Sequence, residues 1–394
     1  MQDRELRPRL PEVRRESFVC PLGRHQRIVH ATGAGAHQAS TLAAMRVVLA
    51  DPPAYTPPYD HALATALARQ GVDVRLLTSR FRYGTVPAAD GYTVDDSLYR
   101  ISTAIGSRAG RLAAKAFEHP FALARLGLAD CDLVHLQWLS APEADAWLLH
   151  TRTPLVFTAH DLLPRRTAHR ARSWGRLFAR FDRIVTHSER GRRTLVAFGV
   201  PEHKLRVISH PATRSDPERR DDGRTVLALG VIRPYKSLPD AVEAVLGIPE
   251  ARLLVAGDAR IPLEELRAAA GDRAEWRLGY LDESEIERAL GAATVAVFPY
   301  RAELDQSGAL LQTIGAGVPA VVYDVGGLGE TVAAYGAGRV VAPGDVDALR
   351  AALRELLDDR DALAQARAGA ERARAALTWE RAAAEHVALY RELG

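Results

Sequence analysis

Two cations stand three residues apart where a strand-like run gives way to a helix. The run at 225–229 is followed by Gly-Val-Ile-Arg-Pro-Tyr-Lys, which contains Gly230, Arg233 and Lys236. An arginine fork and a lysine ammonium beside a helix amino terminus both favour phosphate oxygens. A solvated basic loop is the plainer alternative, but lysine is scarce here, with three lysines among 52 basic residues. The pattern predicts a diphosphate site.

A second candidate anion site opens a helix further along the chain. The amides of Ser307, Gly308 and Ala309 would lie in its first turn, where backbone N–H groups have no partner within the helix and can bind phosphate or sugar oxygens. Gln312 would lie about one turn further in. Its amide could bond a ribose diol, without the charge-assisted bond that a carboxylate makes.

Alternating strand-like and helical runs position these loops. From Met45 onward, short Val, Leu and Ile runs alternate with Ala, Arg, Leu and Glu stretches of helical period, which is typical of parallel sheets covered on both faces. The expected strands are 46–50, 73–78, 132–137, 154–159, 183–187 and 205–209, then 225–229, 252–256, 275–278, 294–298, 318–323 and 338–342. We therefore predict an α/β protein with two doubly wound, Rossmann-like domains. Ligand loops follow the carboxyl ends of the strands in such sheets.

The order of these motifs resembles that of family 4 glycosyltransferases, retaining enzymes of the two-domain GT-B fold. The resemblance rests on Gly-x-Ile-Arg-x-x-Lys at 230–236, Gly-x-Pro at 317–319 and Gly-Gly-x-x-Glu ending at Glu330, and it covers the chain from Met45 onward. It implies transfer of a sugar from a nucleoside-diphosphate sugar to an acceptor hydroxyl. In such enzymes the matching Arg233 and Lys236 contact the donor diphosphate.

Composition gives the boundaries of a domain plan, and the resemblance gives the roles of its domains. We expect a disordered leader at 1–44, or an upstream mis-assigned start, and an acceptor-binding domain at 45–215. The donor domain would follow at 216–375, after a proline-rich and charged linker. The last helix, at 376–394, would cross back to the first domain, and the two domains would face a cleft.

Other donor contacts are carried over from the resemblance. Gly257 matches a family turn, and Gly279, Tyr280 and Leu281 fall where the family backbone cradles the base, although glycine is equally the default turn residue. Glu330 lies near the nucleotide in the family, or caps the first turn of its own helix.

The acidic segment before Ser307 departs from the family pattern. Glu303 takes the place of the first of two family glutamates, but Gln312 replaces the second, and the loop between them is one residue longer. Whether Glu303 or Asp305 faces the donor sugar stays open, and either could be a surface carboxylate.

His160 follows the expected strand at 154–159 and would face the interdomain cleft. In the resembled family a histidine here bonds the donor sugar, although a lone histidine is often structural. Front-face attack through an oxocarbenium-like state is implied, with charge growing on the leaving diphosphate, so His160, Arg233, Lys236 and Glu303 are the candidate catalytic residues. No metal or other cofactor is expected. A nucleotide-sugar epimerase, a phosphorylase, or a non-catalytic nucleotide-sugar-binding subunit remains an alternative.

Two further features concern the acceptor and the membrane. Tyr55 and Tyr59 in a proline-rich loop could shape an acceptor pocket, or could simply pack. Between 161 and 193, Trp174, Leu177, Phe178 and Phe181 recur at helical spacing among many arginines. Such a helix either binds anionic lipid or a charged acceptor, or faces the core. The acceptor could be a sugar, a lipid-linked molecule or a small molecule.

Composition restricts the class of protein. The chain has 394 residues, 47% hydrophobic and 26% charged, with a net charge of +3, which does not favour nucleic-acid binding. Cys20 and Cys131 are the two cysteines, so a disulfide framework is not expected. No run is long and apolar enough for a membrane span or a signal peptide. We expect a cytoplasmic enzyme, with peripheral contact at the inner membrane face as a possibility.

Overall fold

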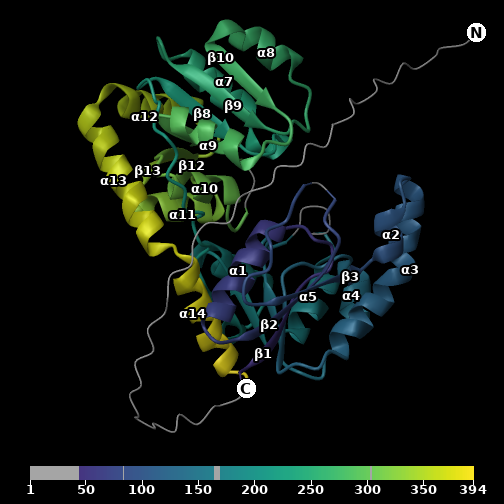
Figure 1. Ribbon diagram of the computed structural model, residues 1–394. Coiled ribbons are helices and arrows are strands. Elements are labelled where there is room, and N and C mark those ends of the chain that lie inside the picture. Colours follow the sequence, from purple (N-terminus) through teal and green to yellow (C-terminus); the bar gives the residue numbers. More distant parts are fainter. Residues whose placement is uncertain (1–43, 83, 164–168, 302–303) are drawn as a thin grey trace, which may run out of the picture. The chain divides into compact units, whose positions relative to one another are not determined.

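The computed structural model describes residues 44–82, 84–163, 169–301 and 304–394 (Figure 1). The predicted leader at 1–44 therefore lies outside the described residues except for Ala44, and Glu303 lies outside them as well.

The first sheet has seven parallel strands in the order β3-β2-β1-β4-β5-β6-β7. The strands are β1 (Arg46–Asp51), β2 (Asp73–Ser79), β3 (Thr93–Leu98), β4 (Leu133–Leu136), β5 (Leu155–Thr158), β6 (Arg183–Thr186) and β7 (Leu205–Val207). The helices of this domain are α1 (Pro57–Arg69), α2 (Arg100–Ala104), α3 (Arg108–Gly127), α4 (Pro142–Leu148), α5 (Ala171–Arg180) and α6 (Glu189–Phe198), followed by the 3-10 turn η1 (Glu202–Lys204).

The second sheet has six parallel strands in the order β10-β9-β8-β11-β12-β13. The strands are β8 (Thr225–Leu229), β9 (Arg252–Gly257), β10 (Ala274–Leu278), β11 (Val295–Phe298), β12 (Ala320–Tyr323) and β13 (Gly338–Val341). The helices are α7 (Leu238–Leu246), α8 (Glu264–Ala270), α9 (Glu283–Ala292), α10 (Gly308–Gly315), α11 (Gly326–Tyr335), α12 (Val346–Asp358) and α13 (Arg360–Ala376), with 3-10 turns η2 (Pro234–Lys236) and η3 (Gly271–Arg273).

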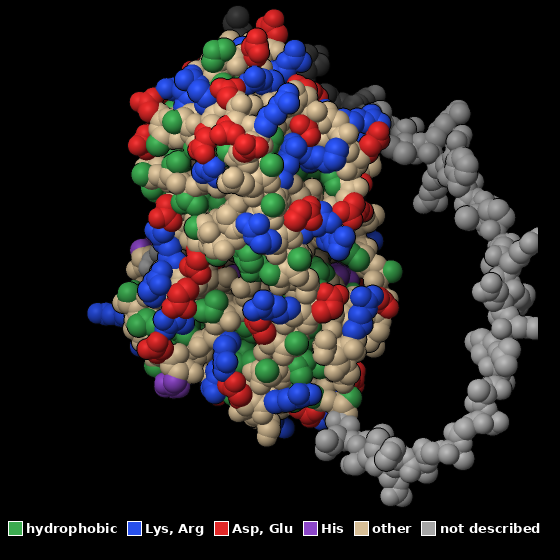
Figure 2. All heavy atoms as spheres, turned by 90° about the vertical axis from the view of Figure 1, so that its left-hand side faces the viewer, with side chains coloured by type: hydrophobic (Ala, Val, Ile, Leu, Met, Phe, Trp, Pro, Cys, Tyr) green, Lys and Arg blue, Asp and Glu red, His purple; other side chains and the backbone are tan. Residues whose placement is uncertain are grey.

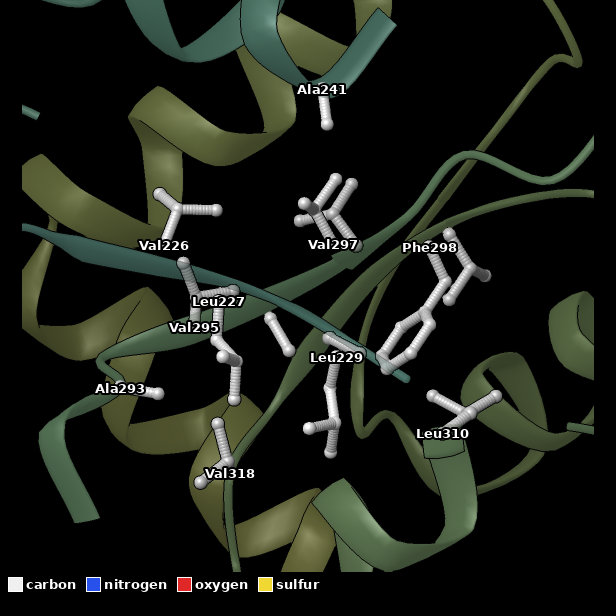
Figure 3. Close-up of a cluster of buried hydrophobic side chains, with 14 of the residues drawn as sticks. Val226, Leu227, Leu229, Ala241, Ala293, Val295, Val297, Phe298, Leu310 and Val318 are labelled. Carbon is white, nitrogen blue, oxygen red and sulfur yellow. The ribbon is translucent and has the colours of Figure 1, made fainter. Parts of the chain in front are cut away.

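The core of the second domain forms around its two central strands. Val226, Leu227 and Leu229 of β8 and Val295 and Val297 of β11 are buried, and Figure 3 shows them between helices on both faces of the sheet. Burial on both faces explains why these strands read as continuous apolar runs in the sequence. This core fixes the carboxyl ends of β8 and β11, from which the loops predicted to bind the donor extend.

The last helix, α14 (Trp379–Arg391), returns to the first domain and packs on α1 (Figure 1). Val387 and Tyr390 of α14 join the core of the first sheet, and the Tyr390 hydroxyl lies 2.7 Å from Nδ1 of His135 on β4. The predicted GT-B architecture, with the carboxyl-terminal helix crossing back, is confirmed.

Strand β3 was not predicted from the sequence. Its residues, Thr-Val-Asp-Asp-Ser-Leu, are mostly polar and exposed, because β3 is an edge strand with little core to cover. The other predicted strands are present. The basic helix predicted within 161–193 is α5, and it buries Trp174, Leu177 and Phe178. Its apolar stripe therefore belongs to the core and offers no lipid-binding face.

Surface charge is mixed on the face shown in Figure 2, where basic and acidic side chains alternate over both domains. This agrees with the small net charge of +3. Within the described ranges, no helix combines the length and the apolar character that crossing a bilayer requires.

Candidate active site

The turn after β8 brings a cation, a glycine and a helix amino terminus together. Gly230 has a φ of +100°, and a Cβ placed on it would lie 3.1 Å from Cβ of Ala309 and 3.3 Å from Nζ of Lys236. Any side chain at Gly230 would therefore fill the space between the lysine ammonium and the first turn of α10. A compact anion is the ligand that suits a space bordered by an ammonium and a helix amino terminus.

Lys236 lies in a half-buried environment. Its ammonium sits 4.9 Å from the centroid of the Tyr300 ring, where a cation–π attraction is expected. The pKa of Lys236 is lowered to about 8, chiefly by burial and also by the neighbouring Arg233, while Tyr235 acts in the opposite direction. Arg233 itself is exposed at the start of η2. The two predicted cations thus border one turn, and one of them titrates close to neutral pH.

Gly257 holds the shape of this turn from the neighbouring strand. A Cβ on Gly257 would lie 2.4 Å from the backbone oxygen of Gly230, and its φ is +144°. The amide of Gly230 donates to the Ala256 oxygen at 2.8 Å, and the amide of Ile232 donates to the Asp258 oxygen at 2.8 Å. Close backbone packing explains this glycine without a ligand.

The segment predicted to cradle the base follows β10. Gly279 has a φ of +121° with open space where a Cβ would lie. The side chain of Tyr280 is 70% exposed, and its hydroxyl lies beside Gly84 of the first domain, since a Cβ there would approach it to 2.6 Å. Leu281 packs against the core of the second domain. This segment therefore offers an open backbone surface flanked by an aromatic ring.

The amino terminus of α10 forms the second side of the candidate donor site. Ser307 is its N-cap, with Oγ accepting from the Leu310 amide at 3.4 Å. Gly308 and Ala309 open the first turn, where backbone amides lack intrahelical acceptors. Gln312 is half-buried, and no hydrogen bond to its side-chain amide is found within the described part of the chain.

His160 lies just beyond β5, in contact with helix α1 and with the loops that follow β4 and β6. Its ring stacks on Trp138 at 5.2 Å and meets Tyr59 edge-on at 4.7 Å. Its Nε2 lies 2.9 Å from the Gln137 side-chain oxygen, and its Nδ1 lies 3.3 Å from Nε2 of His187. Burial and the neighbouring His187 hold the pKa of His160 well below its usual range. His160 is therefore a neutral imidazole at neutral pH, and its ring plane is fixed.

The tautomers of His187 and His160 follow from the hydrogen bond that His187 makes to the backbone. Nδ1 of His187 lies 3.0 Å from the Ile208 backbone oxygen, to which it must donate. Nε2 of a neutral His187 then accepts, so His160 donates from Nδ1 and accepts at Nε2. This arrangement requires the Gln137 amide to turn its NH₂ group toward Nε2 of His160, which places its oxygen against Nε2 of His135, 3.2 Å from the other end of the amide. His187 and Gln137 together thus set the tautomer of His160.

Carboxylates of the second domain bind the amino terminus of α6. Asp305 accepts hydrogen bonds from the His187 backbone amide and, at 2.5 Å, from the Ser188 hydroxyl. Glu330 accepts from the amides of Glu189 and Arg190 at 2.8 and 2.9 Å. Anionic groups at a helix amino terminus are favoured by the helix dipole. The second domain therefore bonds the element that also carries His187.

This contact shows which groups Asp305 and Glu330 bind. Asp305 is fully buried and faces α6, and burial raises its pKa to about 7 despite the bonds from His187 and Ser188. The Glu330 carboxylate lies on α6 of the first domain, and it caps that helix instead of its own. In this arrangement both carboxylates bind protein backbone.

The proline-rich loop after β1 is shaped by a buried pair of acids. Asp51 accepts from the amides of Tyr55 and Thr56 at 2.6 and 3.0 Å. Burial and the adjacent Asp51 raise the pKa of Asp60 well above its usual range, so the pair holds a proton. Tyr59 is 6% exposed and packs against His160, whereas Tyr55 is 55% exposed. Tyr55 alone of the two tyrosines offers a surface to an acceptor.

Sequence reasoning missed Gln137, Trp138 and His187. All three follow the carboxyl ends of β4 and β6, so the rule that selected His160 could have selected them. Among the described residues, no group of three or more His, Cys, Asp or Glu side chains could hold a metal ion.

Two family models match the chain. Residues 59–213 match "Glycosyltransferase Family 4", and residues 223–359 match "Glycosyl transferases group 1". Glycogen synthase of Mycobacterium tuberculosis is 29% identical over 366 residues, covering 80% of this chain and 84% of the relative. The 2-deoxystreptamine glucosyltransferase of Streptomyces kanamyceticus is 33% identical over 161 residues, covering 39% of this chain and 41% of the relative.

Solved structures share the fold. Sucrose-phosphate synthase from Thermosynechococcus elongatus superposes with a TM-score of 0.71 at 21% identity, covering 89% of this chain and 99% of that one. Anabaena HepE, solved with UDP and glucose, superposes with a TM-score of 0.65 at 14% identity, covering 89% and 100%. At such identities the likeness concerns the fold. Together with the two family models, it shows that the chain belongs to glycosyltransferase family 4 and is a retaining glycosyltransferase that uses a nucleotide-sugar donor.

Proposed function

We propose that the chain transfers a glucosyl group from a nucleoside-diphosphate glucose to an acceptor hydroxyl, with the donor diphosphate held between the Gly230–Lys236 turn and the first turn of α10. One observation carries this assignment. Lys236 Nζ and Ala309 both border the space left by the missing side chain of Gly230. The glucosyl donor is favoured by the two sequence relatives, which are named glycogen synthase and a glucosyltransferase.

In this proposal the two cations act mainly on the leaving group. As the bond to the sugar breaks, negative charge grows on the diphosphate, and Arg233 and Lys236 stabilise it most in the transition state. The amides of Ser307, Gly308 and Ala309 would bind the same oxygens from the opposite side. Gln312 would bond the ribose hydroxyls, and the base would lie along Gly279, Tyr280 and Leu281.

His160 would bond a hydroxyl of the donor sugar. In the tautomer set by His187 its Nε2 accepts, so a sugar hydroxyl would donate to Nε2 in competition with the Gln137 amide, and the neutral ring places no charge beside the forming cation. His187 and Gln137 would act as positioning residues, because they hold the tautomer and the plane of this ring. No role is assigned to Glu303.

The acceptor would enter along Tyr55 and Trp138, whose rings meet edge-on at 5.4 Å. Aromatic rings of this kind present flat apolar surfaces, which suit a sugar ring or a small cyclic acceptor. We place the reaction in the cytoplasm. If the acceptor is lipid-linked, the reaction would take place at the inner face of the membrane.

Thermal melting with a panel of nucleoside-diphosphate sugars tests the donor site, because a ligand that binds only the folded state raises the melting temperature. We expect stabilisation by a nucleoside-diphosphate glucose and its loss in the Arg233→Ala, Lys236→Ala double variant. His160→Ala should keep donor binding and lose transfer. An unaltered melting shift in the double variant would overturn the diphosphate assignment.

Product analysis separates the alternatives. Incubating the enzyme with the stabilising donor and an acceptor should release nucleoside diphosphate and leave the configuration at the anomeric carbon unchanged. An isomeric nucleotide sugar formed from donor alone would instead indicate an epimerase. Binding without turnover across a broad acceptor panel would indicate a binding subunit.

A further inference from the structure

The carboxyl-terminal helix reaches the candidate site through one hydroxyl group. Tyr390 of α14 and His135 of β4 are fully buried, and the Tyr390 hydroxyl lies 2.7 Å from Nδ1 of His135. On the other side of the His135 ring, Nε2 lies 2.8 Å from the Thr158 hydroxyl and 3.2 Å from the Gln137 amide. The Gln137 amide in turn lies 2.9 Å from Nε2 of His160. A continuous series of short polar contacts therefore joins α14 to the histidine proposed to bind the donor sugar.

The direction of the hydrogen bonds in this series follows from its far end. The Ile208 carbonyl can only accept, so Nδ1 of His187 donates, and the neutral His187 accepts from Nδ1 of His160. Nε2 of His160 is then an acceptor, which requires an N–H of the Gln137 amide. The Gln137 oxygen consequently faces Nε2 of His135, and this nitrogen must carry a proton in order to donate.

The position of the proton on His135 decides the role of Tyr390. A neutral imidazole with its proton on Nε2 has a lone pair on Nδ1, and the Tyr390 hydroxyl lies against that lone pair, so the hydroxyl must donate. The Thr158 hydroxyl accepts from Nε2–H of His135 and shares this proton with the Gln137 oxygen. In the hydrogen-bond series from Tyr390 to Ile208, each group then donates to the next.

Burial makes this direction hard to reverse. Gln137 and Thr158 are fully buried, and His187 is 4% exposed. Burial, and after it the neighbouring histidines, hold the pKa values of His135 and His187 well below their usual range, so both rings stay neutral. A reversed series would need a second proton on His187, because its Nδ1 must still donate to the Ile208 oxygen. A buried polar group left without its partner costs its full desolvation penalty, so a partial reversal is unfavourable as well.

We infer that Tyr390 and His135 are positioning residues for sugar transfer. The Tyr390 hydroxyl keeps the proton of His135 on Nε2. This N–H holds the Gln137 oxygen, so the NH₂ group of the amide faces His160, whose Nε2 stays an acceptor for a sugar hydroxyl. Only the effect on transfer rests on the proposed function, because the direction of the hydrogen-bond series is a property of the free enzyme.

A second contact links α14 to the same histidine. Trp379, the first residue of α14, packs edge-on against the Tyr59 ring at 5.1 Å, and the Tyr59 ring meets His160 edge-on at 4.7 Å. The helix therefore contacts neighbours of His160 through ring packing at its start and through hydrogen bonds near its end. A helix from the carboxyl end of the chain thus supports a group at the candidate site from two positions.

NMR of the free enzyme labelled with ¹⁵N-histidine tests the direction of the series, because the two ring nitrogens of a neutral histidine differ according to which one carries the proton. We expect His135 to be protonated on Nε2 and His160 on Nδ1. The signals are assigned by their loss in His135→Asn and His160→Ala. A proton on Nδ1 of His135 would overturn the inference, because the Tyr390 hydroxyl would then accept.

Tyr390→Phe tests the effect on transfer, because it removes the hydroxyl and keeps the ring that packs in the core. We expect kcat to fall about three- to ten-fold, the effect of one hydrogen bond, while the dissociation constant for a nucleoside diphosphate stays within about two-fold. Tyr92→Phe is the matched control, since the Tyr92 hydroxyl contacts Nδ1 of His61 in the same domain and outside the series. Its kcat should stay within about two-fold of the wild type.

A double-mutant cycle separates positioning from a general structural role. Single-turnover assays with radiolabelled donor measure the residual rate of His160→Ala. In that background Tyr390→Phe should change the rate by less than about two-fold, because the group that it positions is absent. An equal loss in both backgrounds, or a wild-type kcat in Tyr390→Phe alone, would overturn the inference. Normal transfer by His160→Ala would instead count against the proposed function, and the tautomer of His135 in the free enzyme would still test the series.

Discussion

Donor affinity should fall as the pH rises through the pKa of Lys236. An ordinary lysine keeps its charge to a pH above 10, but burial and the adjacent Arg233 lower the pKa of Lys236 to about 8. Below that pH the free enzyme offers an ammonium to the diphosphate. Above it, the free enzyme offers a neutral amine, and binding must first take up a proton. The direction is therefore a loss of affinity toward alkaline pH.

The size of the loss follows from the protonated fraction. With a pKa of about 8, about 90% of the free enzyme carries the Lys236 charge at pH 7 and about 10% at pH 9. A bound diphosphate raises the pKa of the lysine in the complex, so the complex keeps its charge over this range. The dissociation constant should therefore rise about ten-fold between pH 7 and pH 9.

Isothermal titration calorimetry at several pH values provides the measurement. The Lys236→Arg variant is the essential comparison, because arginine stays charged throughout this range and the ligand titrates identically with both proteins. The donor affinity of Lys236→Arg should not change with pH in the range where the donor itself does not titrate. Lys204→Arg is a matched control, since the Lys204 ammonium donates to backbone oxygens of Ala179 and Phe181. It should reproduce the wild-type profile.

Parallel profiles for the wild type and Lys236→Arg would refute this reasoning. That result would mean that the ammonium does not face the diphosphate, even if the donor binds elsewhere on the domain. Binding of saturating donor near pH 8 should be accompanied by net uptake of protons. The absence of this uptake would refute the reasoning independently.

Three further predictions concern neighbouring residues. Gly257→Ala should cost about 2–4 kcal/mol in urea unfolding, because its Cβ would lie 2.4 Å from the Gly230 oxygen, whereas Gly71→Ala, with open space, should cost only about 1 kcal/mol of backbone strain. In the wild type, folding raises the pKa of Asp305, so the folded state binds this proton more tightly than the unfolded state does. The free energy of unfolding should therefore fall by about 4 kcal/mol, through this group, as the pH rises from 3.8 to about 7. Asp305→Asn lacks this loss, so its unfolding free energy relative to wild type should rise across that range and then level off, and a constant difference would contradict the buried charge. Gln312→Glu should lower the donor dissociation constant about five-fold by calorimetry, through a charge-assisted bond to the ribose, and weaker binding would contradict that contact.

The sequence predicted the fold well because parallel strands buried on both faces read as apolar runs. β8 and β11 are such strands, and the loops after them contain the predicted cations and helix amino terminus. Strand β3 was not predicted because it lacks such an apolar run. An edge strand that is mostly exposed and contains two aspartates carries no such run.

Contacts between the domains could not be predicted from local pattern. Asp305 and the His187 amide are 118 residues apart in sequence, and nothing near Asp305 specifies a partner at that distance. From the sequence, a ligand or solvent was the expected neighbour of this carboxylate. The structure gives it a third possibility, the amino terminus of a helix in the other domain, which only the assembled fold provides.

The position of Asp305 links the two halves of the candidate site. Its carboxylate bonds the His187 amide, and the His187 ring bonds His160, which would face the donor sugar. Two residues later in the chain, Ser307 caps α10, whose first turn would bind the diphosphate. The Asp305 backbone oxygen is also bonded by the Gly327 amide at 2.9 Å, which fixes this loop from a third direction. A movement of one short loop would therefore shift both the histidine that we propose to bind the sugar and the helix that we propose to bind the diphosphate, so the geometry of transfer would depend on the contact between the domains.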